Sequence, residues 1–163
     1  MELNDVLARV ATFNTPTVCV TGGEPLAQKN CLALLNALCN AGYSVSLETS
    51  GALDISAVDA RVSRIMDIKP PASGEAGRNR WENLPLLNKH DEIKFVLADR
   101  DDYAWALAVM RRDDFPKEVP VLFSPVFGKL QAHMLAEWIL KDGVSARMQI
   151  QLHKLLWGEE RAR

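Results

Sequence analysis

The chain has 163 residues, a net charge of −2 and 48% hydrophobic residues, which suits one soluble domain with a sizeable core. It has no basic stripe of the kind that binds nucleic acid, and no apolar run near the ~20 residues that cross a bilayer. The first residues also lack the basic and apolar regions of a signal peptide, so the sequence predicts a cytoplasmic protein without nucleic-acid or membrane partners.

Apolar periodicity and turn residues divide the chain into alternating helices and strands. The strands are predicted over residues 17–20, 43–47, 64–68, 93–97, 119–123 and 147–152. The helices are predicted over residues 3–10, 28–41, 55–58, 81–87, 99–112 and 130–141, and a loop over 72–79. This alternation predicts an α/β fold of parallel strands with right-handed crossovers.

The arrangement of the sheet is either a flat doubly wound sheet or a barrel. Several strands alternate polar and apolar residues, whereas strands covered on both faces are apolar throughout. Ser44, Ser46 and Glu48 oppose Val45 and Leu47, and the strand from Arg147 alternates in the same way. This favours a barrel whose lumen holds a polar ligand, although the last strand also fits a sheet edge with one solvated face.

The three cysteines are Cys19, Cys31 and Cys39. Their odd number argues against a disulfide framework, and their spacing matches no common metal site. Cys31 and Cys39 lie among leucines at helical spacing, which predicts buried apolar side chains. We therefore expect no metal site in this sequence.

Gly22 and Gly23 follow the strand that ends at Val20 and precede a helix. Glycine there lets a ligand approach the main chain, and a helix N-terminus favours an anionic group. A plain tight turn between strand and helix would also explain the glycine pair.

Charged residues on strands give the remaining candidates. Asp67 and Lys69 share one face of a strand, where opposite charges can hold a zwitterion such as an amino acid, although a surface ion pair would look the same. Glu48 and Lys94 fit either a pocket or its rim. His153 adjoins Lys154 and is expected to share its strand face with Gln151, which makes it a candidate pocket residue.

Five motifs together resemble one family of radical S-adenosylmethionine enzymes, 7-carboxy-7-deazaguanine synthase, over roughly residues 3–157. They are Thr21-Gly22-Gly23-Glu24-Pro25, Glu48-Thr49-Ser50-Gly51, Asp67-Ile68-Lys69, Lys94-Phe95-Val96 and Gln149-Ile150-Gln151-Leu152-His153-Lys154. The resemblance implies a partial parallel βα barrel and a carbon–nitrogen lyase that makes 7-carboxy-7-deazaguanine, a queuosine precursor, from 6-carboxy-5,6,7,8-tetrahydropterin with loss of ammonia. It also implies S-adenosylmethionine, a [4Fe-4S] cluster, Mg²⁺, an electron donor such as flavodoxin, and a homodimer.

The resemblance also assigns roles to single residues. Those implied to meet S-adenosylmethionine are Gly22, Gly23, Glu24, Glu48, Asp67, Lys69, Ser124 and Pro125. Those implied on the substrate side are Thr21, Lys94, His153 and Lys154, of which Lys94 or Lys154 would supply a cation for the substrate carboxylate.

One family feature, the cluster-binding Cys-x3-Cys-x2-Cys, does not occur in the sequence. We expect residues 1–163 to form a single radical S-adenosylmethionine domain without its first βα unit, with the cluster cysteines and Mg²⁺ ligand upstream of Met1, so that this chain does not hold the cluster. The alternatives are a cluster-less module that binds a pterin or adenosyl ligand, a non-catalytic remnant, or another radical enzyme such as an activase. The Gln-Leu-His-Lys string at 151–154 argues against the last.

Overall fold

The computed structural model describes residues 2–158, without the side chains of residues 153, 155 and 157. The strands are β1 (Thr17–Val20), β2 (Ser44–Thr49), β3 (Ser63–Ile68), β4 (Glu92–Leu97), β5 (Val121–Pro125) and β6 (Arg147–Met148). The α-helices are α1 (Leu3–Ala11), α2 (Cys31–Asn40), α3 (Arg100–Met110), α4 (Ala132–Asp142) and α5 (Leu152–Trp157). Short 3₁₀ helices span Pro25–Ala27, Pro71–Ser73, Ala76–Arg78 and Trp81–Leu86.

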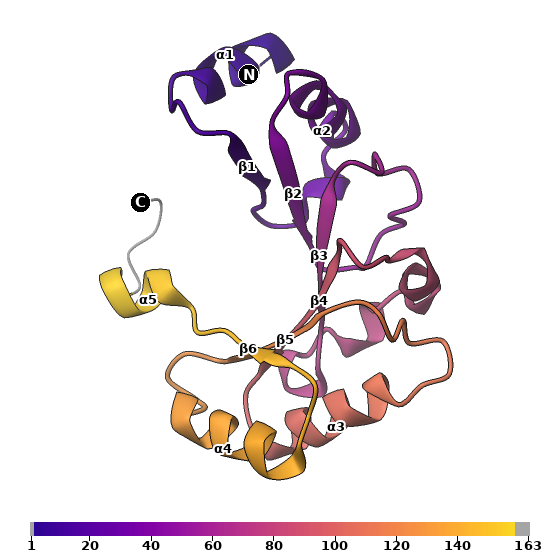
Figure 1. Ribbon diagram of the computed structural model, residues 1–163, viewed down its shortest axis with the longest axis vertical. Helices are drawn as coiled ribbons and strands as arrows, with labels where there is room; N and C mark the ends of the chain where they lie inside the picture. Colours follow the sequence, from indigo (N-terminus) through magenta and orange to yellow (C-terminus); the bar gives the residue numbers. More distant parts are fainter. Residues whose placement is uncertain (1, 159–163) are drawn as a thin grey trace.

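All six strands form one parallel sheet whose order, β1 to β6, is the order of the sequence. A doubly wound sheet would reverse its strand order at a switch point, and no reversal occurs among these strands. The sheet curves without closing, so that β1 and β6 are its two edges (Figure 1). The predicted α/β class is confirmed, and the arrangement is a partial barrel.

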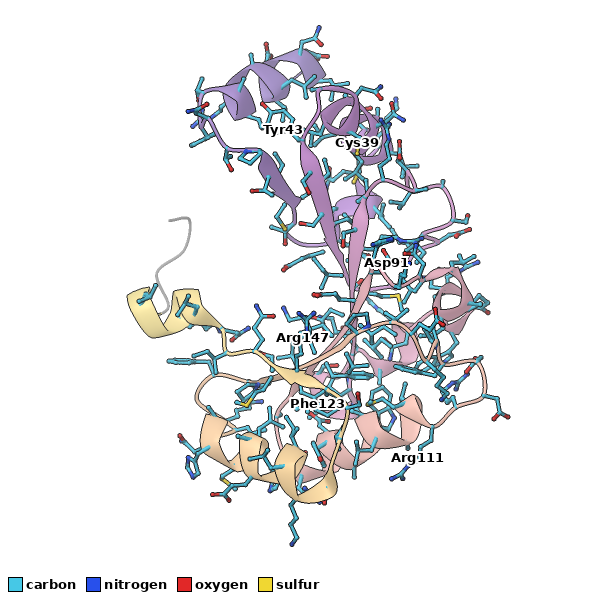
Figure 2. The ribbon with its side chains drawn as sticks, in the orientation of Figure 1. Cys39, Tyr43, Asp91, Arg111, Phe123 and Arg147 are labelled. Carbon is cyan, nitrogen blue, oxygen red and sulfur yellow. The ribbon has the colours of Figure 1, made fainter. Side chains whose placement is uncertain are left out.

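The two faces of the sheet differ as the alternation of residues predicts. In β2, β3 and β4, every second side chain is buried and those between are more exposed. The buried face packs under α2, α3 and α4, which lie on the convex side (Figure 1). Figure 2 shows Phe123 of β5 between the sheet and these helices, where it packs edge-on against Phe95 and Tyr103.

The concave face carries the polar residues, and the strand register aligns them in rows. Asp67 of β3 lies opposite Lys94 of β4, Lys94 lies opposite Leu122 of β5, and Leu122 lies opposite Arg147 of β6. Arg147 reaches across β5 to form an ion pair with Glu92 of β4. The predicted polar lumen is therefore present as an open, concave surface.

The predicted helix over residues 55–58 is wrong, because this segment is a series of turns. Asp54 accepts a hydrogen bond from the Ser56 amide at 2.8 Å, a local turn that competes with a helix. Asn83, which is fully buried, donates to the Leu53 carbonyl at 2.8 Å and accepts from the Ile55 amide at 3.4 Å. Tertiary bonds therefore hold this loop in place.

The predicted strand over residues 147–152 is only two residues long, and Leu152 begins helix α5. The Gln149 amide donates to the Phe123 carbonyl at 2.9 Å, and the next ladder bond would need an N–H from Pro125. Proline has no N–H, so the pairing stops and the chain leaves the sheet. The expectation that Gln151 and His153 share a strand face is therefore wrong.

Candidate functional site

A polar cleft of about 160 Å³ lies on the concave face, where β1 to β4 reach their carboxyl ends. Ligands of parallel βα folds commonly bind at this end of the strands. Nine residues line the cleft: Thr21, Gly23, Glu48, Thr49, Ser50, Ile65, Asp67, Lys69 and Lys94. All of them except Ile65 come from four of the five sequence motifs, and all except Gly23 and Ile65 carry polar or charged side chains.

The glycine pair at the cleft takes backbone angles that other residues rarely adopt. The φ angles are 103° at Gly22 and 57° at Gly23. A Cβ at either position would meet no atom within 4 Å, so glycine is needed here for conformation and not for lack of space. The exposed main chain of Gly23 is thus available to a ligand in the cleft.

Four charged residues line the cleft: Glu48, Asp67, Lys69 and Lys94. The Thr21 hydroxyl donates to Glu48 Oε2 at 3.1 Å, which orients that carboxylate. Lys69 Nζ donates to Asp67 Oδ2 at 2.8 Å, and the Lys69 main chain is held in turn by two hydrogen bonds to the Asn79 amide. Asp67 and Lys69 therefore lie on one face, as predicted from their spacing, and form an ion pair that lines the cleft.

Two polar groups in the cleft are free to form further hydrogen bonds or ion pairs, as far as the described residues show. Asp67 Oδ1 is buried and has no hydrogen-bond partner among the described residues. Lys94, opposite Asp67 in the register, forms no ion pair within the part of the chain that the structure describes. A buried acceptor without a donor costs free energy, which a ligand N–H could recover.

Glu24 occupies a different environment from the other motif residues. Its carboxylate accepts hydrogen bonds from the Leu26 amide at 3.1 Å, the Thr49 hydroxyl at 2.9 Å and the Ser50 amide at 2.8 Å. The Ser50 hydroxyl also donates to it. The Glu24 side chain therefore does not line the cleft. It joins the turn after β1 to the end of β2, and both of these segments do line it.

The remaining predicted residues lie elsewhere. Pro125 lines a second, largely apolar cleft of about 370 Å³, with Ser124 buried on the strand beside it. Lys154 Nζ lies 5.7 Å from the ring centroid of Phe127, which lines the same cleft, so this lysine is not in the first cleft. The His153 side chain lies outside the described residues. Gly22 lines a third cavity, of about 260 Å³, beside α1 and α2.

The sequence-based candidates omitted three residues that line the polar cleft: Thr49, Ser50 and Ile65. Ser50 could have been predicted, because it lies two residues after Glu48 in the Glu48-Thr49-Ser50-Gly51 motif. In an extended chain, such residues point to the same side. Ile65 shares its strand face with Asp67, but an isoleucine in a strand gives no sign of contacting a polar cleft.

The three cysteines do not fit an iron–sulfur cluster. Cys19 is exposed on β1, Cys31 is buried where α2 begins, and Cys39 lies near the other end of α2 (Figure 2). Burial raises the pKa of the Cys31 thiol, with a contribution from the Glu24 carboxylate, and burial also raises the pKa of Cys39. Cluster ligands are thiolates that converge on one point. Within residues 2–158, no group of three His, Cys, Asp or Glu residues is placed to hold a metal ion.

Solved structures with the same arrangement of strands and helices identify the fold. A crystal structure of QueE from Escherichia coli matches with a TM-score of 0.70 and 22% identity, over 93% of this chain and 64% of that one. Streptococcus suis SuiB, solved bound to S-adenosylmethionine, matches with a TM-score of 0.63 and 10% identity, over 93% of this chain and 42% of that one. The fold is thus the open parallel βα barrel that QueE and SuiB also have.

Curated relatives give the family. The 7-carboxy-7-deazaguanine synthase of Chlorobaculum tepidum is 42% identical over 98% of this chain and 74% of the relative, and that of Koribacter versatilis is 41% identical over 86% and 69%. The Methanospirillum hungatei enzyme of the same name is 36% identical over 96% of this chain and 65% of its own length. The chain belongs to the 7-carboxy-7-deazaguanine synthase family. No family model matches it, and none of the described helices is long and apolar enough to cross a membrane.

Proposed function

We propose that the polar cleft binds the amino-acid end of S-adenosylmethionine. The observation that carries this proposal is the pair of unused groups in adjacent positions, the buried Asp67 Oδ1 and the Lys94 ammonium. An α-ammonium group would satisfy the first and an α-carboxylate the second, while the open main chain at Gly23 would add polar contacts. These residues fit a zwitterion better than they fit an anion or a cation alone.

The reaction we propose is the family's, the conversion of 6-carboxy-5,6,7,8-tetrahydropterin to 7-carboxy-7-deazaguanine with loss of ammonia. In that family, S-adenosylmethionine supplies a 5′-deoxyadenosyl radical. The described residues would bind and orient the two ligands, and the helices on the convex face keep water from one side of the sheet. Lys154 beside the apolar cleft would receive the substrate carboxylate, because Lys94 is assigned to the α-carboxylate of S-adenosylmethionine, and Thr21 and His153 would be further substrate contacts.

The other family properties are also proposals for this protein. They are a Mg²⁺ ion, an electron donor such as flavodoxin, a homodimer and a cytoplasmic location. We derive no step through a [4Fe-4S] cluster, because the cysteines of this chain do not fit one.

The poor fit of the cysteines to a cluster favours a second candidate function, a module that binds an adenosyl or pterin ligand without a cluster. The cleft needs none of the three cysteines, since none of them lines it. Binding of S-adenosylmethionine is common to the enzyme and to a module for an adenosyl ligand, so these two differ only in turnover. Formation of 5′-deoxyadenosine by the reduced chain would support the enzyme, and binding without turnover would support the module.

Calorimetric titration with S-adenosylhomocysteine tests the binding site. We expect Lys94→Met to weaken binding by about ten- to a hundredfold, the range for a lost charged hydrogen bond. Lys141→Met, which removes an exposed lysine far along α4, is the matched control and should bind as the wild type does.

A second ligand shows which end of the probe Lys94 meets. 5′-Methylthioadenosine lacks the amino-acid end, so Lys94→Met should leave its affinity unchanged. Equal affinity of wild type and Lys94→Met for S-adenosylhomocysteine would contradict the proposed site.

A further inference from the structure

The carboxylate of Glu24 joins two loops that are far apart in the sequence. One is the turn after β1, which contains the glycine pair, and the other is the end of β2 and the start of the next turn, at Thr49 and Ser50. The bonds to Thr49 and Ser50 span 25 and 26 residues of sequence, whereas the bond to the Leu26 amide is local. Both segments supply residues to the polar cleft.

The turn after β1 needs such a link because its backbone is intrinsically permissive. Gly22 and Gly23 both have positive φ, and glycine can leave that region more readily than other residues can. Their exposed main chain has open space on the side where a Cβ would stand. The Glu24 carboxylate, one residue later, ties the turn to the end of β2, which is paired on both sides in the sheet.

The same bonds leave Glu24 little capacity to meet a ligand. Its two oxygens receive donors from the Leu26 amide, the Thr49 hydroxyl, and both the amide and the hydroxyl of Ser50. Glu48 differs, because its one side-chain bond among the described residues is to the Thr21 hydroxyl and it lines the cleft. The two glutamates therefore have different tasks.

We propose that Glu24 is a positioning residue, which fixes the glycine turn against the Thr49–Ser50 turn and so sets the width of the ligand cleft without contacting the ligand. This rests on the proposed function of the cleft. Charge-assisted bonds from main-chain amides are among the stronger ones in proteins, so a carboxylate suits this task better than an amide.

Amide hydrogen exchange of the ligand-free protein tests the link directly. In Glu24→Ala, no side-chain oxygen is left to accept a bond from the Ser50 amide. We expect this amide to exchange at least tenfold faster than in the wild type, while the amide of Leu47 within β2 keeps its rate and shows that the sheet is intact. An unchanged rate at Ser50 would overturn the proposal.

Affinity for S-adenosylhomocysteine tests the consequence. Glu24→Gln should bind about tenfold more weakly, and Ser50→Ala should also bind more weakly, because each removes part of one linkage. The double variant should bind no worse than Glu24→Gln. By contrast, in the double variant of Glu24→Gln and Lys94→Met the affinity should fall by the product of the two single losses, because Lys94 would contact the ligand itself.

The outcomes separate this proposal from the function on which it rests. If the losses of Glu24→Gln and Ser50→Ala multiply, Glu24 acts independently of the linkage and the proposal is wrong. If the wild type does not bind S-adenosylhomocysteine, the proposed function of the cleft fails, and Ser50 exchange in the ligand-free protein still decides whether Glu24 makes the link. A merely structural role would lower the melting temperature but leave the affinity of the folded variant unchanged.

Discussion

Gly51 is the residue of the second motif that is most constrained by its neighbours. Its φ angle is 70°, and a Cβ there would lie 2.8 Å from Cγ and 2.9 Å from Sδ of Met66. Met66 is only 2% exposed and has little room to move. This glycine is therefore explained by backbone conformation and packing, without a ligand contact.

We predict that Gly51→Ala lowers the free energy of unfolding by ~2–4 kcal/mol, from the left-handed backbone and the overlap together. Gly42→Ala is the matched control, because Gly42 also has a positive φ, of 87°, but its Cβ would meet nothing within 4 Å. Gly42→Ala should lower the free energy of unfolding by only ~1–2 kcal/mol, because only the left-handed backbone contributes. Urea denaturation measures both values, and equal losses would show that Met66 adjusts without cost.

At the candidate site, the strand face on which a residue lies could be predicted from the sequence, but its side-chain contacts could not. The alternation of β2, β3 and β4 placed Glu48, Asp67 and Lys94 on one face. The register pairs Asp67 with Lys94 and Glu48 with Ile65, and all four residues line the cleft. The direction of the Glu24 side chain could not be predicted, because the motif shows an acid after two glycines but not its hydrogen-bond donors on another strand.

At the scale of elements, the predictions succeeded where periodicity extends over a helix or a buried strand. The helix predicted from Asp99 is present as α3, and the Asp99 side chain caps it by accepting from the Asp102 amide at 2.9 Å. The failures at 55–58 and 147–152 have tertiary causes, the bonds of Asn83 in the first case and the missing N–H of Pro125 in the second. Asn83 and Pro125 lie outside the two segments, whereas the turn at Asp54 and Ser56 that also opposes the first helix is local.

The contact between α3 and α4 contains a buried tyrosine whose ionisation should couple to folding. Tyr103 is fully buried, and its hydroxyl donates to Asp142 at 3.1 Å. Burial, the hydrogen bond to Asp142 and the charge of Asp142 raise the pKa of Tyr103 to about 12, although Arg100, which stacks on the ring, opposes this. The folded state therefore keeps the phenol proton at a pH where the unfolded chain, with its ordinary pKa near 10, has lost it.

We predict that this contribution to stability is fully present below pH 10 and is lost as the pH rises from about 10 to 12, because the folded pKa is the higher one. The loss should be roughly 2–3 kcal/mol. Urea unfolding at a series of pH values measures it, with Tyr103→Phe as the control for lysines that titrate in the same range. The variant should show a smaller decline above pH 10, and an equal decline would contradict the prediction.

At the scale of the whole molecule, one sheet separates two environments. The convex face builds the apolar core under α2, α3 and α4, while the concave face keeps its charged side chains for the cleft and for the Arg147–Glu92 pair. The thiols are divided in the same way, since Cys19 belongs to the concave face and Cys31 to the core. The fold therefore keeps the cysteines apart in position and in chemistry.

This separation predicts how the whole chain behaves with iron and sulfide. Cys19 is exposed, whereas Cys31 is 5% exposed and has a raised pKa because of burial and Glu24, which disfavours the reactive thiolate. Under anaerobic reconstitution, we expect no iron–sulfur absorbance and no 5′-deoxyadenosine from the residues 1–163. Maleimide labelling of the folded chain, read by mass spectrometry, should modify Cys19 first and Cys31 only after denaturation. A bound cluster, or protection of all three thiols by iron and sulfide, would show that the cysteines converge after all.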